Sequence, residues 1–202
     1  MERNPIDTFY LLDSSTVTKK TSPVITWKTL AWFANEAYHV RPAANYGFAI
    51  QEGTKRYQVW KRASTVIFAI RGTEMTDMDD IRTDVLLAAG QLKKSSMFRY
   101  LYTIFLSWKD RYPEIWLTGH SLGGTIAYEI SSLTGVDCVV FNPGAHPPSV
   151  GGVMRNQTKS RADIFLIVGD VISEWAKLWP GTVHLLSATG QNAPHSMINF
   201  LS

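Results

Sequence analysis

Residues 116–125 read Trp-Leu-Thr-Gly-His-Ser-Leu-Gly-Gly-Thr and place Ser121 at the centre of the pattern G-x-S-x-G. Residues 114–118, which alternate and then become apolar, predict a buried strand, and the small and apolar residues of 121–133 predict a helix. A serine at the apex of so tight a turn is pushed out of the sheet, and the two glycines remove side chains that would collide there. Because the helix begins at the serine, its free N–H groups point to where an oxyanion would form. The pattern favours an exposed nucleophile, and an ordinary glycine-rich turn is the alternative.

The composition is that of a globular protein. The chain has 202 residues, of which 45% are hydrophobic and 18% charged. This length fits one domain over residues 1–202, and a disordered chain would carry fewer apolar residues. Residues 1–24 are polar and irregular, so we expect an N-terminal arm there.

The charge and the cysteine content indicate which kinds of partner and which cellular compartment to expect. The net charge is +3, and no run of Lys or Arg exceeds two residues. These values argue against nucleic acid and would favour an anionic lipid surface. Cys138 is the single cysteine, so no internal disulfide is possible. We find no signal peptide and no apolar run of membrane-spanning length, so a cytoplasmic or intracellular location is expected.

Strands and helices alternate along most of the chain. This order predicts an α/β fold resembling that of α/β-hydrolases, with a mostly parallel central sheet and helices on both faces. A hairpin precedes the alternation, with Gly53 expected to supply a positive φ at its turn. Strands are expected at 46–52, 56–61, 64–70, 114–118, 136–141, 163–168 and 183–186. Helices are expected at 26–39, 81–89, 95–111, 121–133, 171–178 and 195–201.

A serine nucleophile needs a base, and the base needs an orienting acid. On sheets of this kind the acid follows the serine in the chain and the histidine follows the acid. Asp170 directly follows a predicted strand, at the sheet edge where such sites form. Asp137 and Asp163 are expected at the opposite edge, and Glu129 lies along the helix after the serine. Glu174 is the reserve candidate, and capping of the following helix is the structural alternative for Asp170.

The same order selects the histidine. His195 follows the last predicted strand and comes after the acid, whereas His146 comes before it. His184 lies inside the last strand and is expected to line a wall. His120, next to the serine, is expected to point into the sheet in a structural role, and we also count it among the candidate substrate-binding residues.

An oxyanion hole requires two hydrogen-bond donors. The backbone N–H of Leu122, directly after the nucleophile, is the first candidate. Thr73, at the end of the run Arg71-Gly72-Thr73 after a predicted strand, is the second, and Gly72 would permit close approach. The alternative is a plain strand-ending turn in which Arg71 forms a salt bridge.

The segment between the acid and the base is rich in tryptophan. Trp175, Leu178 and Trp179 have helical spacing and would form one apolar face. That face could line an acyl chain or contact a membrane, and core packing is an equally good interpretation. The other side of such a site is expected to be lined by Met78, Leu86 and Leu87.

Several of these motifs together resemble the fungal-type (class 3) lipase family. They occur in family order at 66–73, 80–85, 119–124, 141–144, 169–170 and His195. The resemblance implies ester hydrolysis on an α/β-hydrolase sheet, with Ser121, Asp170 and His195 as the catalytic triad. It also implies that Thr73 and Leu122 form the oxyanion hole.

The resemblance further assigns Asp84 a structural role near the oxyanion loop. The expected activity is hydrolysis of lipid carboxylic esters, as in a lipase, a phospholipase A1 or an esterase. The expected partners are a lipid or small ester substrate and a membrane or lipid-droplet surface, and we expect neither cofactor nor metal. An acyltransferase or thioesterase using the same triad is an alternative, as is a non-catalytic lipase-like binding or structural protein.

Overall fold

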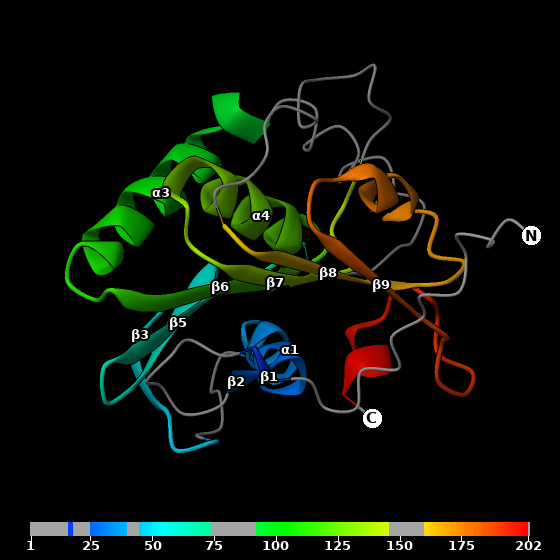
Figure 1. Ribbon diagram of the computed structural model, residues 1–202, viewed down its shortest axis with the longest axis horizontal. Coiled ribbons are helices and arrows are strands. Elements are labelled where there is room, and N and C mark those ends of the chain that lie inside the picture. Colours follow the sequence, from blue (N-terminus) through cyan, green and yellow to red (C-terminus); the bar gives the residue numbers. More distant parts are fainter. Residues whose placement is uncertain (1–15, 18–24, 40–44, 74–91, 146–159, 202) are drawn as a thin grey trace, which may run out of the picture.

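A seven-stranded sheet forms the centre of the fold, and its strands lie in chain order (Figure 1). The strands are β3 (Ala49–Gly53), β4 (Tyr57–Arg62), β5 (Thr65–Ile70), β6 (Glu114–His120), β7 (Cys138–Phe141), β8 (Ala162–Ile167) and β9 (Thr182–Leu186). The pairs β3–β4 and β4–β5 are antiparallel, and every pair from β5 to β9 is parallel. The expected fold class, with its mostly parallel sheet, is confirmed.

The computed structural model describes residues 16–17, 25–39, 45–73, 92–145 and 160–201. The helix expected at 81–89 lies outside these residues, as does the expected N-terminal arm (1–24) except for residues 16–17. That described pair forms the short strand β1 (Thr16–Val17), which pairs antiparallel with β2 (Ile25–Thr26), so at these two positions the arm is regular and not irregular as predicted.

Helices cover both faces of the sheet, as expected (Figure 1). The helix α1 (Trp27–Glu36) lies on one face together with the 3₁₀ helix η4 (Met197–Phe200). The other face carries α3 (Ser96–Lys109), α4 (Leu122–Thr134), and the 3₁₀ helices η1 (Leu92–Lys94) and η3 (Glu174–Leu178). β5 is buried on both sides: Phe68 belongs to the core under α3 and α4, and Ile67 belongs to the core over α1. A continuous apolar run is what such a strand requires.

The hairpin turn differs from the prediction. Gly53 lies inside β3, paired with Gln58, and it is not among the residues with positive φ. The turn is held instead by Thr54, whose hydroxyl accepts from the N–H groups of Arg56 and Tyr57 at 3.0 and 3.2 Å. A side-chain hydroxyl thus satisfies the backbone, and no left-handed glycine is needed.

The two last helices are also shorter than predicted. The helix expected at 171–178 is a 3₁₀ helix over residues 174–178, and the one expected at 195–201 is a 3₁₀ helix over residues 197–200. Ser196 begins the second of these, with its side chain accepting from the N–H of Ile198. His195 therefore lies on a loop just before a helix, which leaves its backbone free to be held by other parts of the protein.

Candidate active site

The turn between β6 and α4 forces Ser121 into an unusual conformation. Its φ is 55° and its ψ −131°, a strained combination for a residue with a side chain. A Cβ on Gly123 would lie 2.2 Å from the carbonyl oxygen of Ile70, and one on Gly119 would lie 2.6 Å from the carbonyl group of Gly123. Both positions therefore exclude any larger residue, as the sequence pattern predicts.

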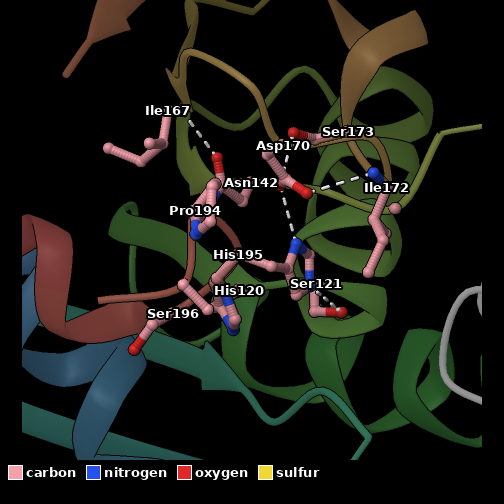
Figure 2. Close-up of polar contacts among 12 residues, drawn as sticks. His120, Ser121, Asn142, Ile167, Asp170, Ile172, Ser173, Pro194, His195 and Ser196 are labelled. Carbon is pink, nitrogen blue, oxygen red and sulfur yellow. Dashed lines mark hydrogen bonds and ion pairs between the residues drawn. The ribbon is translucent and has the colours of Figure 1, made fainter. Parts of the chain in front are cut away.

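The three residues selected from the sequence lie together at the carboxyl ends of the parallel strands (Figure 2). The imidazole Nε2 of His195 is 2.9 Å from Ser121 Oγ. Its Nδ1 is 2.7 Å from Asp170 Oδ2. All three side chains are buried. Hydroxyl, imidazole and carboxylate thus form one continuous line of hydrogen bonds.

Asp170 is held in its ionised form by several donors. Burial raises the pKa of its carboxyl, but hydrogen bonds from His195, the Ser173 hydroxyl (2.7 Å) and the Ile172 N–H (3.0 Å) outweigh it and lower the pKa below its ordinary value. An ionised carboxylate can only accept, so His195 Nδ1 carries a proton and Nε2 is left to accept from Ser121. The aspartate binds the turn before η3, whereas the N-cap of η3 is Ser173.

The other candidate acids and histidines are engaged elsewhere. Glu174 pairs with Lys177 at 2.6 Å on the surface. Asp163 lies within β8, not before it, and forms its own pair with His184 at 2.9 Å. Glu129 pairs with Lys93 of η1 at 3.0 Å. His146 lies outside the described residues.

The loop after β5 passes directly beside the nucleophile. A Cβ on Gly72 would lie 3.2 Å from Ser121 Cβ and 2.6 Å from the His120 carbonyl oxygen. Leu122 is the first residue of α4, so its N–H is one of those that the helix cannot satisfy. Thr73 follows Gly72 and is half-buried, and its role as second donor stays a prediction.

The predicted apolar face of three residues is wrong. Trp175 and Leu178 are 40% and 50% exposed, whereas Trp179 is 5% exposed and packs on Tyr128 of α4 with 4.5 Å between ring centroids. Trp179 is the C-cap of η3 and has an extended backbone, which turns its side chain away from the other two. Trp179 is a core residue, and the substrate-facing role of Trp175 and Leu178 stays a prediction. The expected other side of the site, made of Met78, Leu86 and Leu87, lies outside the described residues. Asp84, which was expected to have a structural role near the oxyanion loop, also lies outside them.

The His120 side chain is held by hydrogen bonds within the protein. Its side chain is 2% exposed, with Nδ1 3.0 Å from the Tyr38 hydroxyl and Nε2 2.8 Å from the His195 carbonyl oxygen. Both ring nitrogens are occupied within the protein, which supports the structural interpretation, and the substrate-binding role stays a prediction. Burial, with the neighbouring His195, lowers the pKa of the His120 imidazole to about 3, so the ring is neutral.

Two asparagines near the site were missed from the sequence. The base loop, residues 193–196, is held by buried side chains. Asn142 donates to the carbonyl of Pro194 at 2.9 Å and accepts from the N–H of Ile167 at 2.9 Å (Figure 2). Asn199 donates to the first carbonyl of the loop, also at 2.9 Å. The motif 141–144 marked Asn142 as a strand end, but nothing in the sequence tells which carbonyl its amide reaches.

Within the described ranges, no group of three or more His, Cys, Asp or Glu side chains could hold a metal ion. Over the same ranges, no helix combines the length and the apolar character needed to cross a membrane.

Solved structures that resemble this chain do so distantly, and two of them illustrate the likeness. One likeness is to a fungal lipase–inhibitor complex, described as a model for interfacial activation in lipases: TM-score 0.47, 14% identity, covering 72% of this chain and 71% of that one. The other is to an α/β serine hydrolase homologue from Coxiella burnetii: TM-score 0.41, 12% identity, covering 72% of this chain and 88% of that one. No protein-family model and no curated protein matches the sequence.

The parallel strands β5–β9, the helices on both faces and the strand–serine–helix turn after β6 give the chain an α/β-hydrolase-like fold. The narrower resemblance to class 3 lipases stays a prediction, because no family model supports it.

Proposed function

We propose that this protein is a serine hydrolase that cleaves carboxylic esters of lipids through an acyl-enzyme. The observation that carries the proposal is the line of hydrogen bonds from Ser121 Oγ through His195 to Asp170, at 2.9 and 2.7 Å. Its ends lie on the strained turn after β6 and just after β8. Nucleophile, base and orienting acid in this geometry are what acyl transfer requires.

The chemistry follows from the hydrogen-bond directions. Ser121 Oγ attacks the ester carbonyl carbon while His195 Nε2 takes its proton, and Asp170 stabilises the imidazolium that forms. The N–H groups of Leu122 and Thr73 would stabilise the oxyanion. His195 then returns the proton to the departing alcohol, leaving the acyl group on the serine. A water molecule, deprotonated by the same imidazole, releases the acid and restores the enzyme.

Exposed apolar side chains near the aspartate favour a lipid over a small polar ester. Val168 and Val171 flank Gly169-Asp170, and Trp175 and Leu178 follow on η3, all of them exposed. Apolar surface gathered beside a site is typical of contact with lipid or protein. The net charge of +3 would favour an anionic lipid surface over a cationic one.

The test is a chain-length series of p-nitrophenyl esters, from butyrate to palmitate, with a panel of phospholipids alongside. We expect turnover by the wild type and none above background by Ser121→Ala, which should also lose labelling by a fluorophosphonate probe. Equal, slow turnover of all esters by both proteins would show that the proposed function is wrong. Transfer of the acyl group to an added alcohol or thiol in preference to water would indicate an acyltransferase instead.

A further inference from the structure

A second line of hydrogen bonds crosses the candidate site behind the nucleophile. Tyr38 lies just past α1, and its hydroxyl packs against Gly72, in the loop after β5: a Cβ on Gly72 would lie 2.4 Å from the hydroxyl oxygen. The same hydroxyl is 3.0 Å from His120 Nδ1, and His120 Nε2 is 2.8 Å from the carbonyl oxygen of His195. Two side chains thus connect the loop after β5 to the base loop (193–196), and one of them belongs to the residue preceding Ser121.

The donors and acceptors in this line fit only one arrangement. The His195 carbonyl can only accept, so His120 Nε2 carries the ring proton and donates to it. Because the ring is neutral, Nδ1 carries no proton and accepts from the Tyr38 hydroxyl. Every buried polar group in the line has a partner, and removing one member leaves its neighbours unsatisfied.

We propose that Tyr38 and His120 are positioning residues that hold the oxyanion loop, residues 71–73, and the base loop in one fixed relation across Ser121. This inference rests on the proposed function, because the two loops would carry the oxyanion donor and the general base. Neither loop has regular secondary structure, so its placement depends on such contacts. A displacement of about 1 Å in a reacting group can cost about 10²-fold in rate. A rigid connection between the two loops therefore maintains the rate by keeping the reacting groups in place.

The neutral state of His120 is part of this arrangement. Its ring centroid lies 4.9 Å from that of His195. During acyl transfer His195 becomes an imidazolium, and a second cation at this distance would oppose its formation. Because the Tyr38 O–H donates to Nδ1, that nitrogen keeps its lone pair and the His120 ring stays neutral.

The test breaks the line at each of its two side chains in turn. Tyr38→Phe keeps the ring and deletes the hydroxyl. His120→Gln keeps a donor near the position of Nε2 and deletes the acceptor for Tyr38. Tyr46→Phe, at an exposed tyrosine, is the matched control for loss of a hydroxyl. For each variant, kcat and KM are measured on p-nitrophenyl butyrate, together with amide hydrogen exchange at Gly72 and at Ser196, whose N–H is bonded within the base loop.

We expect Tyr38→Phe to lower kcat about tenfold with little change in KM, because the connection acts on geometry and not on substrate binding. Exchange should become faster at both Gly72 and Ser196. His120→Gln should lower kcat similarly, and the double variant should be no worse than His120→Gln alone, because both changes break the same line. If Tyr38→Phe fails to fold, His120→Gln provides the same kinetic and exchange comparison.

Two results would overturn the proposal. One is faster exchange at Gly72 alone, with kcat equal to that of Tyr46→Phe. The other is losses that multiply in the double variant, which would mean that the two residues act independently. A wild type that turns over no ester would refute the proposed function, and the exchange at Gly72 and Ser196 would then decide by itself whether the two loops are coupled.

Discussion

Asp170 determines which ring nitrogen of His195 carries the proton. The aspartate accepts from Ile172, Ser173 and His195, so its carboxylate cannot rotate without breaking several hydrogen bonds. These bonds also lower the pKa of its carboxyl against the effect of burial. The ionised carboxylate fixes the proton of His195 on Nδ1, and only that tautomer can accept from Ser121.

Asp170→Asn should therefore abolish most of the activity without removing the side chain. The amide would present a donor to His195 Nδ1, so the ring proton would move to Nε2 and block acceptance from Ser121. We expect kcat on p-nitrophenyl butyrate to fall by about 10⁴-fold. Asp163→Asn is the matched control, because that aspartate also binds a histidine, His184, in a separate pair. Comparable losses in both variants would contradict the assignment of Asp170.

At the residue scale the sequence identified the three residues of the candidate site but not the contacts that hold them. Ser121, Asp170 and His195 could be found because each follows or ends a strand and because their order in the chain is informative. Asn142 and His120 support the base by binding carbonyl oxygens 52 and 75 positions away. A backbone carbonyl looks the same for every residue type, so no pattern in the sequence can mark such a contact.

The turn between β6 and α4 depends on contact between backbones. The Cβ of an alanine at Gly123 would lie 2.2 Å from the Ile70 oxygen, 2.7 Å from the Arg71 carbonyl carbon and 2.8 Å from the Gly72 nitrogen. All three are backbone atoms of β5 and the loop after it, so no side chain can move aside. The oxyanion loop itself would have to shift.

Gly123→Ala should thus affect both stability and activity. We expect the free energy of unfolding in urea to fall by about 1–3 kcal/mol, and kcat to fall as well, because the loop beside Ser121 is displaced. Gly53→Ala is the control: its Cβ would meet only the end of the Ile50 side chain, at 3.1 Å. An unchanged unfolding midpoint in Gly123→Ala would show that the turn has more room than the backbone distances indicate.

The two tryptophans of the η3 segment should differ clearly in their contribution to the free energy of unfolding. Trp179 is buried against Tyr128, so Trp179→Ala should lower the free energy of unfolding by about 3–5 kcal/mol. Trp175 is exposed, so Trp175→Ala should change it by less than about 0.5 kcal/mol. Urea denaturation of both variants measures the difference. Equal losses would mean that both rings are packed in the core.

This segment also shows where sequence periodicity is insufficient. Spacings of three and four residues indicate a shared face only while the chain stays helical. Here the 3₁₀ helix ends at Leu178, and the next residue is extended. The central strands were predictable because both of their faces are buried and their apolar runs are continuous. Short 3₁₀ segments give no comparable signal, since their conformation is set by the elements they contact.

For the whole molecule, His120 couples stability to pH. Burial above all, together with the charge of the nearby His195, lowers the pKa of its imidazole from the ordinary value of 6.5 to about 3, although Asp170 acts in the opposite direction. In the unfolded chain the same ring would titrate at about 6.5. Between these values the unfolded state binds a proton that the folded state does not, so stability must decrease as the pH falls.

We therefore expect the free energy of unfolding to fall by up to about 1.4 kcal/mol per pH unit below about pH 6.5 because of this one group. Urea denaturation at intervals from pH 7 to pH 4.5 measures the slope and avoids the range below about pH 4, in which the lowered pKa of Asp170 adds its own loss of stability. His120→Gln removes the titrating ring, so its curve should be flatter than that of the wild type by up to one proton over this range. Parallel curves for the two proteins would mean that His120 is protonated as easily in the folded chain as in the unfolded one. That result would contradict the conclusion that His120 is buried and neutral beside the base.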